Sequence, residues 1–290
     1  ASNNTAVGYQ AAYTNTTGSY ISALGYQAAY TSNNAGTICA IGYRALNQNT
    51  TGVDNTAVGS SAGYKNTTGA GNTYVGYQAG YAITTGGANV AIGQGTLQSG
   101  TNTASHNVAI GYAAANNITS GSHNVAIGGN DGSGNSAFFS NTTGQYNVAV
   151  GNGSLQANTT NNSSTAVGYQ AAYSNSTVNG ISAFGYQAAY TTQGTIDAFG
   201  YQALYANTTG TNNSAVGYQA LGRSTAGNNN VAVGDYALRL TTGNSNTGVG
   251  QVALASNTSG SSNTAIGGGA LCHFAGQCRG GANQPHESLA

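Results

Sequence analysis

The sequence predicts an all-β fold, a parallel β-solenoid (β-roll) of about sixteen coils of seventeen residues each. Three observations lead to this prediction. A step of one apolar residue followed by glycine recurs along the chain at a nearly constant spacing. The residues before that step alternate between two faces, as they do in a short strand. An Asn-Thr-Thr-Gly sequence, typical of turns, separates many of the steps.

The glycine of the Val/Ile/Leu/Phe-Gly step marks the repeat. Eleven of the fifteen spacings between successive glycines are 17 residues, and the others are 18, 23, 15 and 16. A disordered Gly/Asn/Ser/Thr linker has no reason to keep such a register, whereas stacked coils must keep it. The repeat covers residues 1–271, and residues 272–290 are expected to form a non-repeat cap or tail. The expected ladder begins with Val7, Gly8, Leu24, Gly25, Ile41, Gly42, Val58, Gly59, Val75 and Gly76.

Each repeat is close to N-T-A-V-G-Y-Q-A-L-Y-x-N-T-T-G-x-x. The N-T-A-V-G part predicts one strand, and the Tyr-Gln-Ala-Leu run at 201–204 and 218–221 predicts a second one. The N-T-T-G part predicts a turn, because asparagine tolerates left-handed geometry and glycine supplies a positive φ. Helices are not expected, since these turns interrupt the chain about every seventeen residues.

The first strand has two different faces. Thr and Val/Ile lie on one face, and Ala and Gly lie on the other. A buried Val or Ile contributes only about 1.5–3 kcal/mol, while ordering seventeen backbones costs roughly 17–34 kcal/mol. We expect the Ala/Gly face, which lacks the bulk for a private core, to approach a neighbouring chain and so favour an oligomer. Tyrosine rows that close a single-chain core are the alternative.

Composition excludes several functions. Charged residues make up 3% of the chain and balance to zero, so nothing indicates nucleic acid or an anionic membrane as a partner. The sequence has no run near the ~20 apolar residues of a membrane-spanning helix, and we expect no membrane insertion. The few acids are scattered, and the glycine-rich segments lack the lysine of a phosphate-binding loop. We therefore expect no enzyme, no cofactor and no bound metal.

The Asn-Val-Ala-Ile-Gly sequence at 107–111 and the Asn-Val-Ala-Val-Gly sequence at 147–151 resemble the N-S-V-A-I-G motif of trimeric autotransporter adhesin heads. The longer N-T-A-V-G-Y-Q-A-L…N-T-T-G unit looks like repeats of phage-type tail fibres and large bacterial surface proteins. This resemblance covers residues 1–271. It implies a left-handed β-roll, three chains about one axis, and a role in attachment. The coil is longer than the usual adhesin unit, and no stalk, anchor or chaperone domain is recognisable.

Many of the turns carry N-x-S/T sequons at one place in the repeat. They could form a row of glycosylation sites, although an asparagine ladder combined with turn chemistry is the favoured interpretation. The asparagines are Asn15, Asn49, Asn66, Asn141, Asn158, Asn175, Asn207 and Asn257. Repeated threonines also suggest an ice-binding array, but the Thr-Thr pairs lie in turns and many coils lack them.

Tyrosine follows the repeat glycine nine times, as at Tyr9, Tyr26 and Tyr43. Such a row could be a platform for sugars or partner chains, but filling a corner of the coil is the favoured interpretation. His106 and His123 are seventeen residues apart and should stack on adjacent coils.

An insertion of six residues falls at about 129–145 and contains Asp131. Its Asp-x-Ser-x-Asn spacing only partly matches a calcium loop, so a tolerated insertion is favoured over a metal site. Cys272 and Cys278 are expected to form a disulfide that pins a cap. Cys39 is expected to act as a small buried hydrophobe, or to pair between chains.

Together these features predict a structural, extracellular fibre or adhesin segment, the shaft of a tail fibre or surface fibre, located at a cell surface or on a virion. Its partners would be copies of itself, as a homotrimer or an end-to-end filament, and cell-surface glycans. The alternative is a self-assembling extracellular filament subunit, and an ice-binding solenoid is the least favoured hypothesis.

Overall fold

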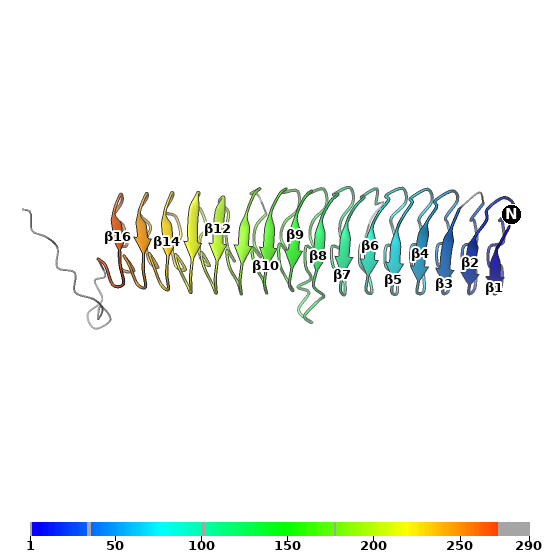
Figure 1. The fold of residues 1–290 in the computed structure, drawn as a ribbon, viewed down its shortest axis with the longest axis horizontal. Coiled ribbons are helices and arrows are strands. Elements are labelled where there is room, and N and C mark those ends of the chain that lie inside the picture. Colours follow the sequence, from blue (N-terminus) through cyan, green and yellow to red (C-terminus); the bar gives the residue numbers. More distant parts are fainter. Residues whose placement is uncertain (1, 34–35, 100–101, 177, 272–290) are drawn as a thin grey trace, which may run out of the picture. The chain divides into compact units, whose positions relative to one another are not determined.

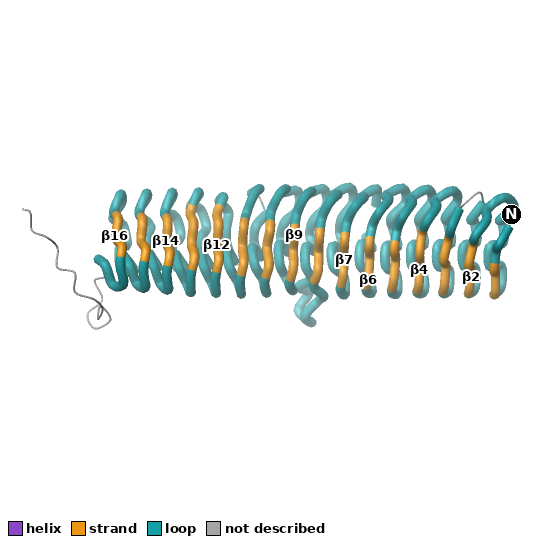
Figure 2. The backbone as a smooth tube through the Cα atoms, viewed as in Figure 1, coloured by secondary structure: helices purple, strands orange, loops and turns teal. Residues whose placement is uncertain are grey.

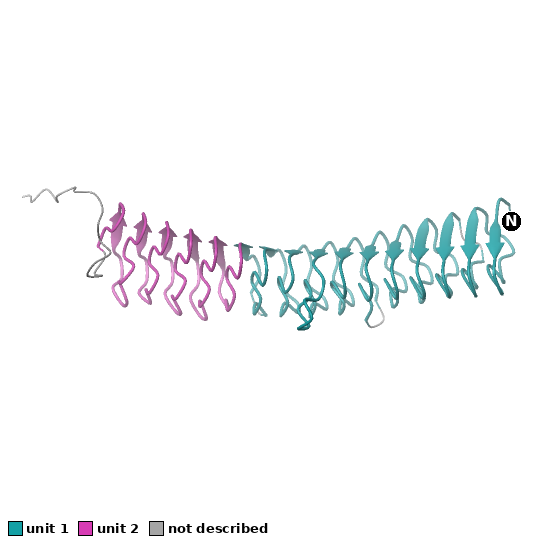
Figure 3. Ribbon diagram, turned by 90° about the horizontal axis from the view of Figure 1, so that it is seen from below, with its two compact units in different colours: residues 1–184 teal, residues 185–290 magenta. Residues whose placement is uncertain are grey.

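The computed structural model describes residues 2–33, 36–99, 102–176 and 178–271 (Figure 1). The chain divides into two compact units, Ala1–Phe184 and Gly185–Ala290 (Figure 3). The described residues of both units form strands and turns only, without a helix (Figure 2). Each unit is a stack of coils, and each coil contributes one strand.

The described residues of unit 1 form eleven strands, each paired in parallel with the next in chain order. Corresponding residues of successive repeats lie side by side, such as Ala40 with Ala57. The strands are β1 Thr5–Val7, β2 Ile21–Leu24, β3 Ile38–Ile41, β4 Asn55–Val58, β5 Thr73–Val75, β6 Val90–Ile92, β7 Val108–Ile110, β8 Val125–Ile127, β9 Val148–Val150, β10 Thr165–Val167 and β11 Ser182–Phe184.

Unit 2 repeats this arrangement over residues 185–271, where five strands also pair in parallel, each with the next. The strands are β12 Ile196–Phe199, β13 Asn213–Val216, β14 Val231–Val233, β15 Thr247–Val249 and β16 Thr264–Ile266. The prediction of an all-β, parallel solenoid with coils about seventeen residues apart is confirmed. Residues 272–290, predicted to form a cap or tail, lie outside the described residues.

The prediction of a second strand in each coil is wrong. The Tyr-Gln-Ala-Leu run forms a turn in which alternate residues are left-handed, such as Gln27 (φ 51°) and Ala29 (φ 49°). A pleated strand requires a φ near −120° at every residue, so this run cannot join a sheet. Its backbone still links the coils. The Gln27 N–H donates to Tyr9 in the preceding coil, and the Ala29 N–H donates to Ala45 in the following coil, both at 2.9 Å.

The two strand faces hold the expected residues, but the expectation that the alanine face has no private core is wrong. The central alanine of the strand points into the coil and is fully buried, while the branched residue beside it points outward. In the third coil the private core includes Ala40, Ala45 and Leu46, none of which has accessible surface, together with the buried Ile38. The coil is narrow, so alanine fits between the strand and the turn where a larger side chain would not. The alanine face therefore closes the coil's own core.

The repeat glycine allows the coils to approach closely. Gly59 has a φ of +136°, and a Cβ added there would lie 2.5 Å from the carbonyl oxygen of Gly76 in the next coil. A residue with a side chain would meet this oxygen and would also be strained. Glycine is thus required at this corner because backbone stacks directly on backbone.

One coil replaces the small core alanine with a large ring. Tyr74 of β5 is fully buried, and its hydroxyl makes no hydrogen bond. The ring occupies space that two glycines leave free at turn positions where Leu46 and Leu97 stand in other coils. A Cβ on Gly63 would lie 2.5 Å from Tyr74 Cδ2, and a Cβ on Gly80 would also collide with the ring. Burial raises the pKa of the Tyr74 phenol well above its usual value.

Candidate functional site

The outward side of the strands is the most extensive candidate site in unit 1. We define the outward strand face as the first and third residues of each Thr/Val-Ala-Val/Ile triplet in β1–β11. Its third positions are branched or aromatic and partly exposed, for example Leu24 at 50% and Ile41 at 38%. Together these side chains form an apolar row that runs from coil to coil. The row consists of Val7, Leu24, Ile41, Val58, Val75, Ile92, Ile110, Ile127, Val150, Val167 and Phe184.

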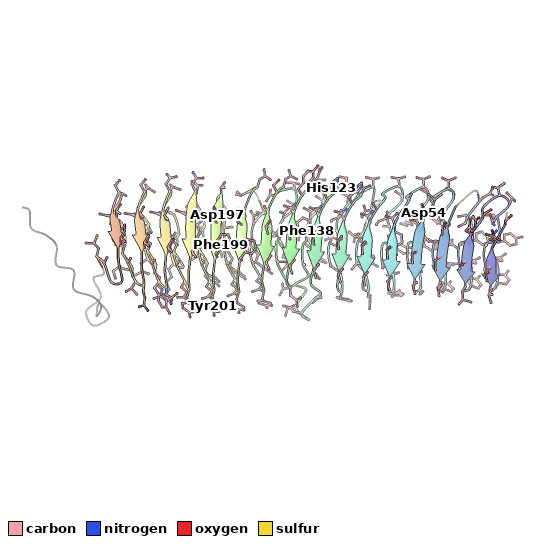
Figure 4. All side chains as sticks on the ribbon, viewed as in Figure 1. Asp54, His123, Phe138, Asp197, Phe199 and Tyr201 are labelled. Atoms are coloured by element: carbon pink, nitrogen blue, oxygen red, sulfur yellow. The ribbon has the colours of Figure 1, made fainter. Side chains whose placement is uncertain are left out.

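The outward strand face differs in charge between the two units. No residue of the outward strand face in unit 1 is charged. In unit 2 the corresponding first position of β12 is Asp197, which is exposed, and its third position is Phe199 (Figure 4). Uncharged apolar surface is costly to leave in water, so the face of unit 1 is the stronger candidate for contact with a partner.

Each unit also contains a column of buried asparagines, which we term the asparagine spine, at the first residue of the strands or just before it. In unit 1 the backbone N–H and Nδ2 of Asn107 both donate to Asn89 Oδ1, at 3.0 and 3.3 Å. Asn107 Nδ2 also donates to the Gly121 carbonyl at 2.9 Å, and Asn107 Oδ1 accepts two bonds from Asn124. Every polar atom of the side chain is thus paired. The spine of unit 1 comprises Asn55, Asn72, Asn89, Asn107, Asn124 and Asn147.

Sequence reasoning did not single out this spine, although the signal was present as the first asparagine of N-T-A-V-G. Unit 2 has the same feature at Asn213, Asn230 and Asn246, where each Nδ2 donates to a backbone carbonyl of the following turn. Isoleucine replaces asparagine at Ile21 and Ile38, which pair with each other one coil apart. These positions are internal, so the spine is a structural element and offers no accessible ligand-binding groups.

The sequon asparagines lie at a second internal position. Six of the eight are buried, and Asn15 and Asn257 are half-buried. Asn66 Nδ2 donates to the Gly69 carbonyl at 3.0 Å and to Asn49 Oδ1 at 2.8 Å. Nδ2 is the atom that would carry an N-linked glycan. Because this nitrogen is hydrogen-bonded inside the coil, the geometry favours the ladder-and-turn interpretation over glycosylation.

The threonines of the turns use their hydroxyls inside the stack. The Oγ1 of Thr50 donates to the Thr67 carbonyl at 2.9 Å, and the Oγ1 of Thr67 donates to the Thr84 carbonyl at 2.9 Å. The same bond recurs in unit 2 from Thr208 to Thr225. These hydroxyl protons are therefore not directed at water, which weakens the basis for an ice-binding array in the turns.

The tyrosines after the repeat glycine are exposed and do not fill a corner of the core, contrary to the favoured interpretation. Tyr9, Tyr26 and Tyr43 are 63%, 40% and 48% exposed and stack with centroids 5.2 Å apart. Unit 2 has a similar stack of Tyr186 and Tyr201; Tyr201 lies at the edge of the strand row (Figure 4). In such a stack the ring faces cover one another, so a sugar meets mainly ring edges and hydroxyls. A sugar platform of the usual face-stacking kind is therefore not formed inside the row.

The two histidines stack as predicted from their spacing. The rings of His106 and His123 lie 4.7 Å apart and nearly parallel, and Tyr146 continues the stack at 5.1 Å from His123. His123 lies at the outer edge of its coil (Figure 4). No acid accompanies the pair: the described coils contain no group of three or more His, Cys, Asp or Glu side chains able to hold a metal.

The insertion forms a loop at 129–136 that projects from the coil between β8 and β9 (Figure 1). Phe138 (φ 55°) then returns to the left-handed core position that leucine holds elsewhere, and it is fully buried. The carboxylate of Asp131 accepts bonds from Asn135 Nδ2 (2.9 Å), the Ser133 N–H (2.9 Å) and Tyr169 Oη (3.2 Å). These bonds, that of Asn135 first, lower the pKa of Asp131. The carboxylate ties the loop to a later coil, which matches a tolerated insertion better than a calcium site.

Cys39 is not the buried residue that the sequence suggested. It pairs with Ser22 and Thr56, so it occupies a first position of the outward strand face and is half-exposed. The reason is that the core of the coil lies on the alanine face of the strand, as described above. Cys272 and Cys278, the predicted disulfide, lie outside the described residues.

Comparisons of the chain with known proteins do not assign it to a family. No family model, curated protein or solved structure matches the chain. No helix within the described ranges is long and apolar enough to span a membrane. The functional argument therefore depends on the repeat and its surface alone.

Proposed function

We propose that this chain is a structural segment of an extracellular fibre or adhesin, a shaft that acts in attachment at a cell surface or on a virion. The observation that carries the proposal is the repetition of one structural unit along the described coils. Positions in the repeat keep one physical role from coil to coil, as core alanine, corner glycine or spine asparagine. A stack of this kind holds other parts of an assembly apart and exposes an extended surface, which is the role of a shaft. We assign it no catalytic activity and no cofactor.

Self-association is part of this proposal. Copies of the chain would assemble side by side, as a homotrimer, and the near absence of charge suits contact with neutral cell-surface glycans. The motif resemblance to trimeric adhesin heads and tail fibres supports the same assembly. Glycans would meet the outer edges of the coils, where the tyrosine hydroxyls lie.

The test combines shape with attachment. Small-angle X-ray scattering of the purified chain should give a pair-distance distribution typical of a rod, and a glycan array should show binding to neutral rather than sialylated or sulfated glycans. A globular distribution would refute the shaft. Binding restricted to anionic glycans, or to none, would remove attachment through neutral glycans.

A further inference from the structure

At the third position of the outward strand face, unit 1 leaves a large apolar residue outside, while the central residue, alanine in most of these strands, lies inside. An isolated solenoid gains stability by burying its largest apolar side chains, yet here alanine is internal while Leu24 and Ile41 remain partly exposed. A continuous apolar row exposed to water is typical of a surface that another molecule covers.

We propose that the outward strand face of unit 1, β1–β11, is the surface through which copies of this chain bind one another. This inference rests on the proposed fibre function and names the surface that the assembly uses. It reverses the sequence-based expectation, in which the alanine and glycine face was shared between chains.

The area of the face reaches the minimum for a specific interface. Eleven strands at a spacing of about 4.8 Å span about 48 Å, and three residues at about 3.3 Å give a width of about 10 Å. The face thus covers about 500 Å² per copy, or about 1,000 Å² for a pair, which reaches the lower size of specific interfaces. It carries no charge that would have to be desolvated.

The periodicity of the face identifies the partner as this chain itself. Side chains project in rows with one row per coil, as in the register of Val90, Val108 and Val125. A surface packs closely against such rows only if its own rows have the same spacing. Another copy of the stack meets this requirement, whereas an ordinary globular surface does not. Asp197 breaks the face in unit 2, so the proposal is confined to unit 1.

The test places charges on the face without disturbing the core. The first variant carries Ile92→Lys, Ile110→Lys and Ile127→Lys, three outward residues of adjacent strands. The matched control carries Thr68→Lys, Thr85→Lys and Thr143→Lys, at exposed turn positions. A third variant changes the same isoleucines to threonine, which occupies outward strand positions natively and should fold even if the lysine variant does not. Mass is measured by sedimentation velocity over a concentration series, and folding by circular dichroism.

The wild type and the control should sediment as the same multiple of 28.6 kDa. The lysine variant should be monomeric, with association weakened at least a hundredfold, and the threonine variant should be intermediate. A folded monomeric wild type, a lysine variant that stays assembled, or a control that dissociates equally would overturn the interface. A monomer with rod-like scattering would overturn the interface alone, whereas a compact monomer would also remove the proposed fibre function.

Discussion

Replacing Tyr74 with alanine should open a cavity in the fifth coil that a single second substitution can refill. Truncating a buried aromatic ring costs about 3–5 kcal/mol. The Tyr74 hydroxyl is buried without a partner, and losing such a group returns about 1 kcal/mol. The expected net loss is therefore about 2–4 kcal/mol. At about 1.4 kcal/mol per factor of ten, the local opening equilibrium should rise about thirty- to several-hundredfold.

The refilling substitution is Gly80→Leu. Gly80 has a φ of +61°, and leucine adopts nearly the same geometry at Leu97 (φ 47°) in the next coil. In the wild type this leucine would collide with the Tyr74 ring, so Gly80→Leu alone should destabilise the coil by about 1–3 kcal/mol. Combined with Tyr74→Ala it restores the alanine-and-leucine core of the other coils. The double variant should therefore be much more stable than the sum of the single effects predicts.

Hydrogen exchange read by mass spectrometry over residues 70–82 is the appropriate assay, because a repeat stack does not unfold in one step. Tyr74→Phe serves as the control and should protect this segment slightly better than the wild type. Additive losses in the double variant would show that Tyr74 and Gly80 do not share one core site, and the account of the fifth coil would fail.

Three further tests examine other elements of the stack. Asn107→Ala removes the acceptor for two donors of Asn124 and should cost about 2–6 kcal/mol, at about 1–3 kcal/mol for each donor left without a partner. Hydrogen exchange at residues 105–126 checks this, and unchanged protection would show that the spine is dispensable. Gly59→Ala places a Cβ against the backbone of the next coil and should disrupt stacking of the two coils. Gly132→Ala, with open space around it, should only strain the loop. If the two variants protect their coils equally from hydrogen exchange, the close approach of the backbones at Gly59 is contradicted. The lowered pKa of Asp131 means that its contribution to loop docking is complete above the unfolded value near 3.9 and is lost as pH falls through the folded value. An NMR titration of the Ser133 amide should therefore show loosening only in strong acid and at no pH in Asp131→Asn, and a midpoint above 3.9 would refute the assignment.

The coil register could be predicted from sequence because one residue type has no substitute at its position. At Gly59 and its counterparts the backbone of the next coil lies so close that a Cβ would collide with it. The spacing of these glycines is therefore the spacing of the coils. The turn after the strand was less predictable. Gln27 and Ala29 are ordinary residues in left-handed geometry, and nothing in their identity distinguishes them from a short strand.

Which strand face is internal could not be read from alternation alone. A period of two separates Ala40 from Ile41 but does not say which points inward, and general hydrophobicity favours the larger residue. The width of the coil decides which face is internal, and that width depends on how the turn that contains Leu46 folds back against the strand. Tyr74 also could not be placed from alternation alone. Its ring fits inside the coil because Gly63 and Gly80, which lie in turns and are not its neighbours in the sequence, are next to it in space.

A density map of the assembled chain at side-chain resolution tests the central claim most directly. It should show Ala91, Ala109 and Ala126 facing the interior of their own coils in one column, with Ile92, Ile110 and Ile127 in a parallel column directed at a neighbouring copy. A map with the isoleucines inside the coil and the alanines at the contact between chains would contradict both the fold of the repeat and the interface inferred from it.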